Sequence, residues 1–284
     1  MRARCPASSA NLGPGFDALA LALALYVEVE VRPAASFAIS CEGEGAELAS
    51  DASHLAAQVA TAVAGHDRLE ILVRSQIPVA RGLGSSAAVA AAAAAAAGAA
   101  DPLALAAARD GHAENAAASV LGGLVAAALV DGRALARRLP LDPGLAFTVL
   151  VPDRTLATAA ARAVLPETVR LADAAFNLGR AGLLLAGFAD RSALVPEAGE
   201  DRLHQAARAA LFPEADELLA RLREGGAVLA CWSGAGPSLL GVCTSRAAAE
   251  RAREAGAAAL EASGVAGRAL VLEPDLAGLV VEAT

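Results

Sequence analysis

Strand-like and helix-like segments alternate along the chain, and this alternation predicts a mixed fold, α/β or α+β. The 284 residues are enough for one large domain or two medium ones. Around residues 139–153, several prolines and a glycine surround a short apolar run, and this change of composition predicts a domain boundary. We therefore expect two domains, 1–145 and 146–284, without an internal repeat of fixed period.

The first half of the chain opens with a turn-rich stretch at 6–16. Apolar and acidic residues alternate toward the end of 19–31, which predicts a half-buried strand. Alanine has the highest intrinsic helix propensity, so the alanine-rich run that ends at Ala97 predicts a helix. Asp101 and Pro102 suit the N-cap and first position of the next helix. The other elements predicted here are a helix at 52–64, a strand at 69–73 and a helix ending at Leu121, which is followed by an apolar segment at 124–130.

The second half has the same alternating character. Short apolar runs predict strands and longer amphipathic runs predict helices. The predicted strands lie at 146–151, 228–232, 239–243 and 268–272, and the predicted helices at 155–164, 171–188, 215–223 and 247–263.

Composition excludes several classes of function. The chain has 31 acidic and 23 basic residues, and phosphate backbones are bound by clustered positive charge, so we expect no nucleic-acid partner. Every basic residue is arginine, which excludes a Schiff-base lysine and a Walker A lysine. The longest apolar block, 87–97, is almost all alanine and far shorter than the roughly 20 residues of a membrane span.

The N-terminus and the cysteines indicate the cellular compartment. Residues 1–11 lack the hydrophobic region of a secretory signal. The four cysteines are scattered without a C-x-x-C pair, which favours reduced thiols over a metal site or a disulfide framework. We therefore expect a cytoplasmic protein with a small-molecule partner and no membrane partner.

A glycine-rich loop, 77–86, opens directly into the alanine-rich helix. Glycines let the backbone approach an anion closely, and the free N–H groups and dipole at a helix start attract it. The two serines at this helix start can cap the backbone, donate to phosphate oxygens or ligate Mg²⁺. We expect a phosphate cradle formed by Pro78, Arg81, Gly82, Leu83, Gly84, Ser85, Ser86 and Ala87.

Three other interpretations of the loop stay open on its residues alone. A dinucleotide-binding fingerprint would need a second strand ending in an acidic residue about 20 positions on, where this sequence predicts another helix. A nucleophile elbow would need glycine where Ala88 stands. The third interpretation is a glycine turn and a serine cap without any ligand.

Two further motifs accompany the glycine loop: PASSANLGPGFD at 6–17 and SGAGPS at 233–238. Each alone is typical of a surface turn. In this order and spacing, the three together resemble the motifs of the GHMP kinases. Within that family, the segments 11–17, 111–123, 158–166 and 201–208 resemble the members that phosphorylate homoserine, and the resemblance covers essentially the whole chain.

This resemblance implies ATP-dependent transfer of a phosphoryl group to the side-chain hydroxyl of L-homoserine, in threonine biosynthesis. It implies a two-domain α+β fold, in which a left-handed βαβ crossover like that of ribosomal protein S5 domain 2 precedes a ferredoxin-like sandwich. A homodimer is also implied. ATP would place its phosphates on the glycine loop, with Gly234 and Gly236 of the third motif on the far wall.

The acceptor-site positions of these kinases match Asn11, Asp17, His112, Thr158, Arg162 and Arg208. The two arginines match the carboxylate-binding positions, and the arginine fork is the best donor to a carboxylate. Asp17, with Asn11, matches the side that holds the amino group and the reacting end. Asn115 matches the residue beside the transferred phosphoryl group, and we expect it to orient the reactants together with Asn11 and His112.

Phosphoryl transfer depends mainly on positioning and charge neutralisation. Ser86 and Asp110 match the Mg²⁺ ligands of the family. The chain departs from the family pattern here, because glutamate usually stands at Asp110 and aspartate at Glu114. The shorter carboxylate leaves room for a water molecule between Asp110 and the ion.

Two alternative functions stay open. A related kinase acting on a different alcohol would not need both arginines of the acceptor site. An ATP-binding regulator without catalysis would bind ATP but not turn it over.

Overall fold

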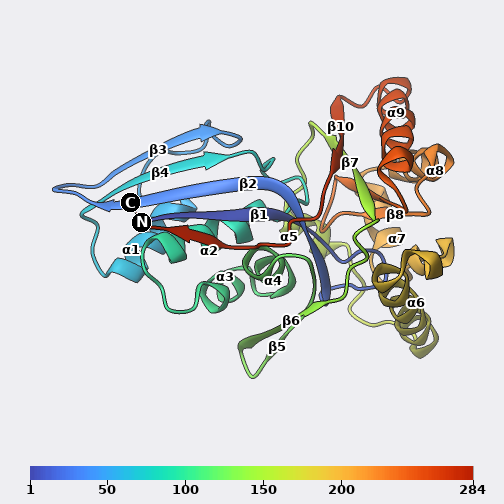
Figure 1. Cartoon of the computed structure of the whole chain (residues 1–284), viewed down its shortest axis with the longest axis horizontal. Coiled ribbons are helices and arrows are strands. Elements are labelled where there is room, and N and C mark those ends of the chain that lie inside the picture. The colour runs from blue at the N-terminus through green and yellow to red at the C-terminus, as the bar shows by residue number, and fades with distance from the viewer. Residues whose placement is uncertain (284) are drawn as a thin grey trace.

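The computed structural model describes residues 1–283 of the chain. Its strands form two sheets, which lie in two lobes (Figure 1). The first ten elements are β1 (Arg2–Ala10), β2 (Leu19–Pro33), β3 (Ala38–Gly43), α1 (Leu55–Ala64), β4 (Leu69–Ser75), α2 (Ser85–Ala96), α3 (Pro102–Asp110), α4 (Glu114–Leu121), β5 (Leu124–Val130) and β6 (Arg133–Leu139). The later elements are β7 (Ala146–Pro152), α5 (Thr158–Ala163), α6 (Leu171–Ala189), α7 (Gln205–Arg208), α8 (Ala215–Gly225), β8 (Leu229–Trp232), β9 (Leu239–Cys243), α9 (Arg246–Ala262), β10 (Gly267–Leu272) and β11 (Val280–Glu282), with short 3₁₀ turns at Arg191–Ala193, Pro196–Gly199 and Ala209–Leu211.

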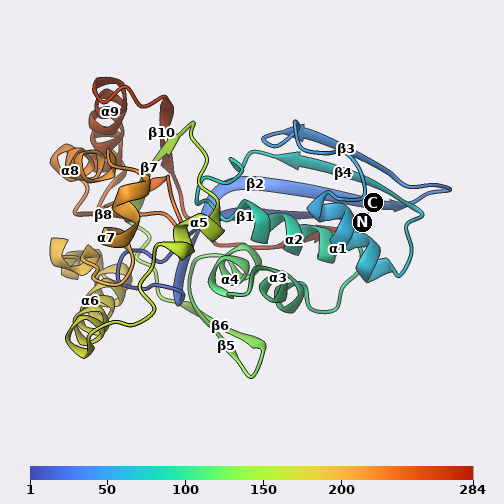
Figure 2. The ribbon, with the colours of Figure 1, turned by 180° about the vertical axis from the view of Figure 1, so that it is seen from behind.

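The first sheet has the order β11-β1-β2-β4-β3, and the β5–β6 hairpin joins it through β2. β3 and β4 are parallel and are connected by α1, so they form a βαβ unit. The long strand β2 pairs with β4 over 27–33 and with β5 over 19–21. Helices α1 to α4 run along one side of this sheet (Figure 2). β11 pairs with β1, so the last described residues return to the first lobe.

The second sheet has the order β10-β7-β9-β8 and is antiparallel throughout. Along the chain, helices separate β7 from β8 and β9 from β10, which is the ferredoxin-like arrangement. Phe212, Trp232 and Leu222 belong to a core under α8 and α9. The predicted α+β fold with a ferredoxin-like second half is therefore confirmed.

Helix α2 is unusual because it is buried on every side. All residues from Ala87 to Ala96 are buried, so the helix has no solvent face along this length. A helix that is apolar all round belongs in a core, and alanine side chains let β1, β2 and the neighbouring helices approach it closely. The N-terminus of α2 is thus fixed rigidly, and the glycine loop leads into it.

Most predicted elements are present within a few residues, but the first segment is corrected. The turn-rich interpretation of 6–16 is wrong at its start, because β1 extends to Ala10 and the turn begins at Asn11. Pro6 lies where the β1–β2 register shifts, and such an irregularity accommodates a residue without an N–H group. The strands β3, β6 and β11 were not predicted, because they lie at sheet edges with largely exposed side chains. No helix of residues 1–283 is long and apolar enough to cross a membrane.

Candidate active site

A cavity of about 670 Å³ lies at the start of α2. Every predicted acceptor-site residue lines it, and so do both predicted Mg²⁺ ligands and Asn115. Of the predicted phosphate-cradle residues, those that line it are Arg81, Gly82, Leu83, Gly84, Ser85, Ser86, Ala87 and Gly234. Pro78 and Gly236 are not among the lining residues. The fold thus brings together residues that are up to about two hundred positions apart in the sequence.

The glycine loop has a shape that only glycine permits at two positions. Gly82 and Gly84 have φ of 74° and 67°. A Cβ at Gly82 would lie 2.2 Å from the carbonyl oxygen of Ser233, and a Cβ at Gly84 would lie 2.0 Å from Oγ of Ser8. Gly84 is the N-cap of α2, and no side chain caps this helix start. Its first N–H groups are therefore free to bind an anion in the cavity.

The side chain of Arg81 forms hydrogen bonds with the backbone of the protein. Its guanidinium donates to the carbonyl oxygens of Val79, Pro152 and Asp153 at 3.0, 2.9 and 2.5 Å. These bonds tie the glycine loop to the end of β7. Arg81 thus stabilises the loop, and the described contacts do not direct its charge at a phosphate.

The third motif closes the loop from the opposite side. The hydroxyl of Ser233 donates to the carbonyl oxygen of Gly82 at 2.7 Å, and the N–H of Ser238 donates to that of Arg81 at 3.2 Å. The N–H of Gly234 donates to the carbonyl oxygen of Ala10 at 3.0 Å, at the end of β1. All three sequence motifs are therefore joined by hydrogen bonds.

Ser86 and Asp110 face each other at the cavity wall. The hydroxyl of Ser86 donates to Oδ1 of Asp110 at 3.1 Å. Burial raises the pKa of Asp110, so this carboxylate lacks the solvation that would stabilise its charge. A hydroxyl and a carboxylate are hard oxygen donors, and Mg²⁺ takes only one or two carboxylates from a protein when phosphates supply other ligands. The pair therefore fits Mg²⁺.

Glu114 starts α4 beside these residues and is 1% exposed. Its Oε1 lies 3.0 Å from Nδ1 of His112, and the carboxylate raises the pKa of that histidine. No residue of the described chain bonds to Oε2 of Glu114. The next residue, Asn115, accepts a hydrogen bond from the Ser8 hydroxyl through Oδ1 at 2.9 Å. A buried anion, a histidine and an amide thus line one end of the cavity.

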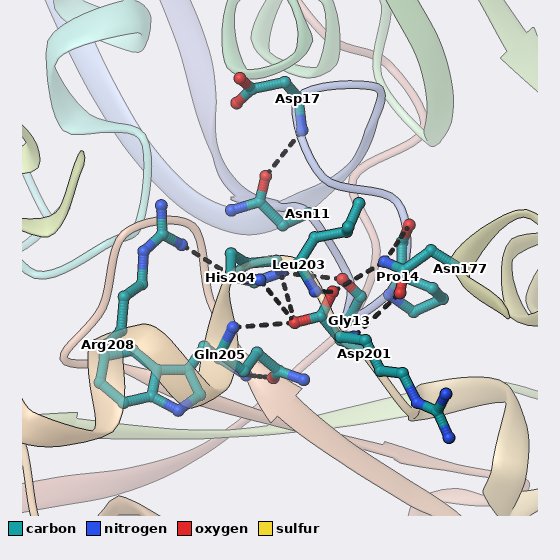
Figure 3. A network of polar contacts seen from close by, with 12 residues as sticks. Asn11, Gly13, Pro14, Asp17, Asn177, Asp201, Leu203, His204, Gln205 and Arg208 are labelled. Atoms are coloured by element: carbon teal, nitrogen blue, oxygen red, sulfur yellow. Dashed lines mark hydrogen bonds and ion pairs between the residues drawn. The ribbon is translucent and has the colours of Figure 1, made fainter. Parts of the chain in front are cut away.

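Arg162 and Asp17 form a forked ion pair in the cavity. Nη2 and Nη1 of Arg162 lie 2.7 and 3.0 Å from the two carboxylate oxygens of Asp17, and both side chains are partly exposed to the cavity. The Asp17 N–H donates to Oδ1 of Asn11 at 3.0 Å (Figure 3). Nδ2 of Asn11 donates to the carbonyl oxygen of Gly234 at 2.8 Å. Asn11, Leu12 and Asp17 all have positive φ, a conformation that is uncommon outside glycine and clusters at functional sites.

Arg208 approaches the same pocket from α7, and its residue is 1% exposed. Its guanidinium donates to Nδ1 of His204 and to the carbonyl oxygens of Gly234 and Ala161. Burial, and then the nearby charge of Arg162, lower the pKa of Arg208 to about 10, so it stays a cation at neutral pH. Thr158, the first residue of α5, completes the wall.

Sequence reasoning missed several contributors. Glu114 carried no role there, and neither Ser8 nor His204 was assigned one, although the motifs contain both. The sequence shows only that these three residues lie in or next to the motifs, because the burial of a side chain cannot be read from a short polar segment. The apolar end of the cavity was missed because its residues are dispersed over three elements and the loops between them: Leu48, Ala49, Leu55, Val73, Val79 and Val89.

Comparison with known proteins identifies the family of the chain. The models of the GHMP kinases N-terminal domain and the GHMP kinases C-terminal region match residues 49–132 and 180–262. Homoserine kinase of Moorella thermoacetica is 38% identical over 258 residues, which cover 86% of this chain and 87% of the relative. Homoserine kinase of Streptomyces avermitilis is 43% identical over 274 residues, 90% of each chain.

A solved structure extends the comparison to the fold. The crystal structure of homoserine kinase from Cytophaga hutchinsonii superposes with a TM-score of 0.87 and 26% identity, over 99% of this chain and 97% of the other. The chain belongs to the homoserine kinase branch of the GHMP kinase family.

Proposed function

We propose that this cytoplasmic enzyme transfers the γ-phosphoryl group of ATP to the side-chain hydroxyl of L-homoserine, forming O-phospho-L-homoserine for threonine biosynthesis. The observation that carries the proposal is the Arg162–Asp17 ion pair, which lies in the same cavity as the glycine loop. A cation and an anion held together beside a phosphate site match the two charges of an amino acid.

Exchange of partners explains how the substrate enters. The α-carboxylate takes the fork of Arg162 and a donor of Arg208, while the α-ammonium takes the carboxylate of Asp17. Both protein charges then stay matched. An acceptor with only one charge breaks the pair and leaves the other partner uncompensated, which is costly in a partly desolvated site. The pocket therefore selects zwitterions over simple alcohols.

ATP fits the rest of the cavity. The N–H groups at the start of α2 and the backbone of 82–86 hold the phosphates. The apolar end, with Leu48, Leu55 and Val89, holds the nucleoside. Ser86 and Asp110 would hold Mg²⁺, which neutralises charge on the phosphates when bound.

The reacting hydroxyl is positioned by the end of the cavity that contains Asn115. The Asn115 amide, fixed by Ser8, orients the hydroxyl toward the γ-phosphoryl group. Glu114 raises the pKa of His112, which favours the positively charged form of this histidine near the transferred group. Asn11 fixes Asp17 and so sets the distance from the ammonium-binding carboxylate to the phosphate loop.

The test is ADP release by the purified protein with Mg-ATP and L-homoserine. L-serine, L-threonine, mevalonate and 4-hydroxybutyrate serve as parallel acceptors, the last being homoserine without its ammonium group. We expect ADP release with homoserine and at least about tenfold lower kcat/KM with 4-hydroxybutyrate. Turnover of mevalonate instead would keep the kinase and discard the amino-acid pocket. ATP binding without turnover of any acceptor would indicate a regulator.

We also propose a domain boundary between residues 145 and 146.

We further propose a homodimer formed through the outer face of α6. Leu171 and Leu178 on this face are 86% and 76% exposed. The exposed positions of α6 before the C-cap are all apolar residues or glycine: Leu171, Ala172, Ala175, Leu178, Gly179, Gly182, Leu183, Ala186 and Ala189.

Charge favours a second copy as the occupant of this face. The flanking Asp173 pairs with Arg170 and Arg202, and Arg180 pairs with Glu200, so the face carries no unpaired charge. A two-fold contact sets a surface against itself, which is unfavourable for net charge and favourable for a neutral apolar face. Light scattering should give a dimer for the wild type and a monomer for Leu178→Asp. Leu135→Asp, at an exposed leucine of β6, should stay dimeric, and an unchanged mass for Leu178→Asp would exclude this interface.

A further inference from the structure

His204 lies beside Arg208 (Figure 3). Unlike Arg208, it is not among the residues that line the cavity. Its side chain is fully buried. Nδ1 lies 2.9 Å from Nη1 of Arg208, and Nε2 lies 2.8 Å from the carbonyl oxygen of Gly13. The imidazole also stacks on the ring of Phe16, with 5.1 Å between ring centroids. It therefore connects α7 to the loop that carries Asn11 and Asp17.

The two partners of His204 determine where its proton lies. A guanidinium can only donate, so Nδ1 must accept and carry no hydrogen. A carbonyl oxygen can only accept, so Nε2 must carry the hydrogen. The imidazole is therefore neutral, in the Nε2–H form. Burial lowers the pKa of His204, which also favours the neutral form.

Asp201 holds this histidine in place. Its carboxylate accepts the N–H groups of Leu203, His204 and Gln205 at 3.0, 2.9 and 2.8 Å, and the amide of Asn177 at 2.7 Å. These four bonds fix the backbone just before α7. The position of the imidazole is thereby set independently of any ligand.

The guanidinium of Arg208 is held on three sides. Nη1 donates to His204 and to the carbonyl oxygen of Gly234, and Nε donates to that of Ala161. Among residues 1–283, no acceptor bonds to Nη2, although the side chain lines the cavity. A long arginine side chain has many rotamers, so three fixed donors leave one free nitrogen in one defined orientation.

We propose that His204 is a positioning residue: through its Nδ1 acceptor it orients Arg208 so that Nη2 receives the α-carboxylate of the amino-acid acceptor. This inference rests on the proposed function. Because Nε2 is bonded to Gly13, in the same loop as Asp17, His204 also fixes the spacing between the groups that bind the carboxylate and the ammonium. The sequence motif at 201–208 thus acts as one unit, in which Asp201 holds His204 and His204 holds Arg208.

Two variants separate the two bonds of the imidazole. Asparagine places an amide oxygen near the position of Nδ1, so His204→Asn keeps the acceptor for Arg208 and loses the donor to Gly13. Glutamine places an amide nitrogen near Nε2, so His204→Gln keeps the Gly13 bond and loses the acceptor. We expect His204→Gln to raise KM for homoserine by about 10- to 30-fold, with kcat and KM for ATP within about twofold of the wild type. His204→Asn loses only the Gly13 bond, so it should raise KM for homoserine by a smaller factor, about threefold, with kcat and KM for ATP again within about twofold of the wild type.

The outcomes distinguish this proposal from the proposed function. Equal KM values for homoserine in the two variants would overturn the positioning role, since lost packing alone would affect both alike. A wild-type enzyme without homoserine-dependent ADP release would overturn the proposed function. The imidazole ¹⁵N spectrum of the wild-type protein tests the geometry without any variant or substrate. It should show a neutral Nε2–H ring at neutral pH, and a hydrogen on Nδ1 would overturn the proposal.

Discussion

The glycine loop and the acceptor pocket border the same cavity but present different chemical groups to it. The loop presents backbone N–H groups. Its glycines determine its shape, and the side chains of Arg81 and Ser233 fix it by donating hydrogen bonds to backbone carbonyl oxygens. The acceptor pocket is made of charged side chains, and two of them, Arg162 and Asp17, neutralise each other. The N–H groups of the loop are therefore unpaired before an anion binds, whereas Arg162 and Asp17 must give up their mutual ion pair before they can bind a substrate.

This difference follows from the ligands. A phosphate group is the same anion in every nucleotide, so a rigid set of N–H groups is sufficient to bind it. An amino acid carries both charges, and in the empty pocket the cation Arg162 and the anion Asp17 pair with each other. Substitutions that change the shape of the loop, and substitutions that change the charge of the pocket, should therefore have the largest effects on activity.

The largest effect should come from shape, in Gly82→Ala. The new Cβ would lie 2.2 Å from the Ser233 carbonyl oxygen, and the backbone has φ of 74°. We expect kcat/KM for ATP to fall by about 100-fold or more, because the loop and the third motif must separate. Gly65→Ala is the matched control: it has φ of 73° but nothing within 4 Å of its Cβ, so it should cost stability without costing activity. Equal activity losses in both variants would show that the clash is not the cause.

Asp17→Asn tests the charge exchange with almost no change of shape. Loss of the ammonium-binding carboxylate should lower kcat/KM for homoserine by about 50-fold. Arg162 is then unpaired, so 4-hydroxybutyrate should gain on homoserine by about tenfold or more in the ratio of kcat/KM values. Glu217→Gln removes the acid of an exposed ion pair with Arg221 and should change neither acceptor. A parallel loss for both acceptors would mean that Asp17 does not bind the ammonium.

Ser86→Ala acts where the two regions meet. Its hydroxyl contacts Asp110 and lies at the start of α2, on the phosphate side. We expect kcat to fall by about 10- to 30-fold, with a smaller change in KM for homoserine. Ser86→Thr keeps the hydroxyl and should recover most of kcat. Parent-like kcat in Ser86→Ala would remove this residue from the site.

The sequence predicted the loop better than the pocket, for a physical reason. Glycine positions and a following alanine run are local features, and α2 begins at Ser85, directly after the glycines of the loop, and ends at Ala96. Asp17 and Arg162 were each assigned to the acceptor site by resemblance, but their mutual ion pair spans 145 positions and depends on the packing of both lobes. The burial of Glu114 and the contacts of His204 likewise arise only in three dimensions. Edge strands such as β3 escaped prediction because they are short: only Ile39 and Cys41 of this strand pack against the core, and two residues make a weak pattern.

Arg81 should show the smallest effect on activity, although it is a cation in a phosphate-binding loop. Its donors are directed at the carbonyl oxygens of Val79, Pro152 and Asp153. Arg81→Met should therefore change KM for ATP by less than about threefold while lowering the free energy of unfolding by about 1 kcal/mol, because two partly buried carbonyl groups and one exposed carbonyl group lose their partner. Denaturant unfolding and steady-state kinetics measure the two quantities, and Arg221→Met on α8 serves as the exposed-arginine control. A large rise in KM for ATP at unchanged stability would show that the loop binds phosphate through a side-chain charge, and the contrast between a backbone-built loop and a charge-built pocket would then fail.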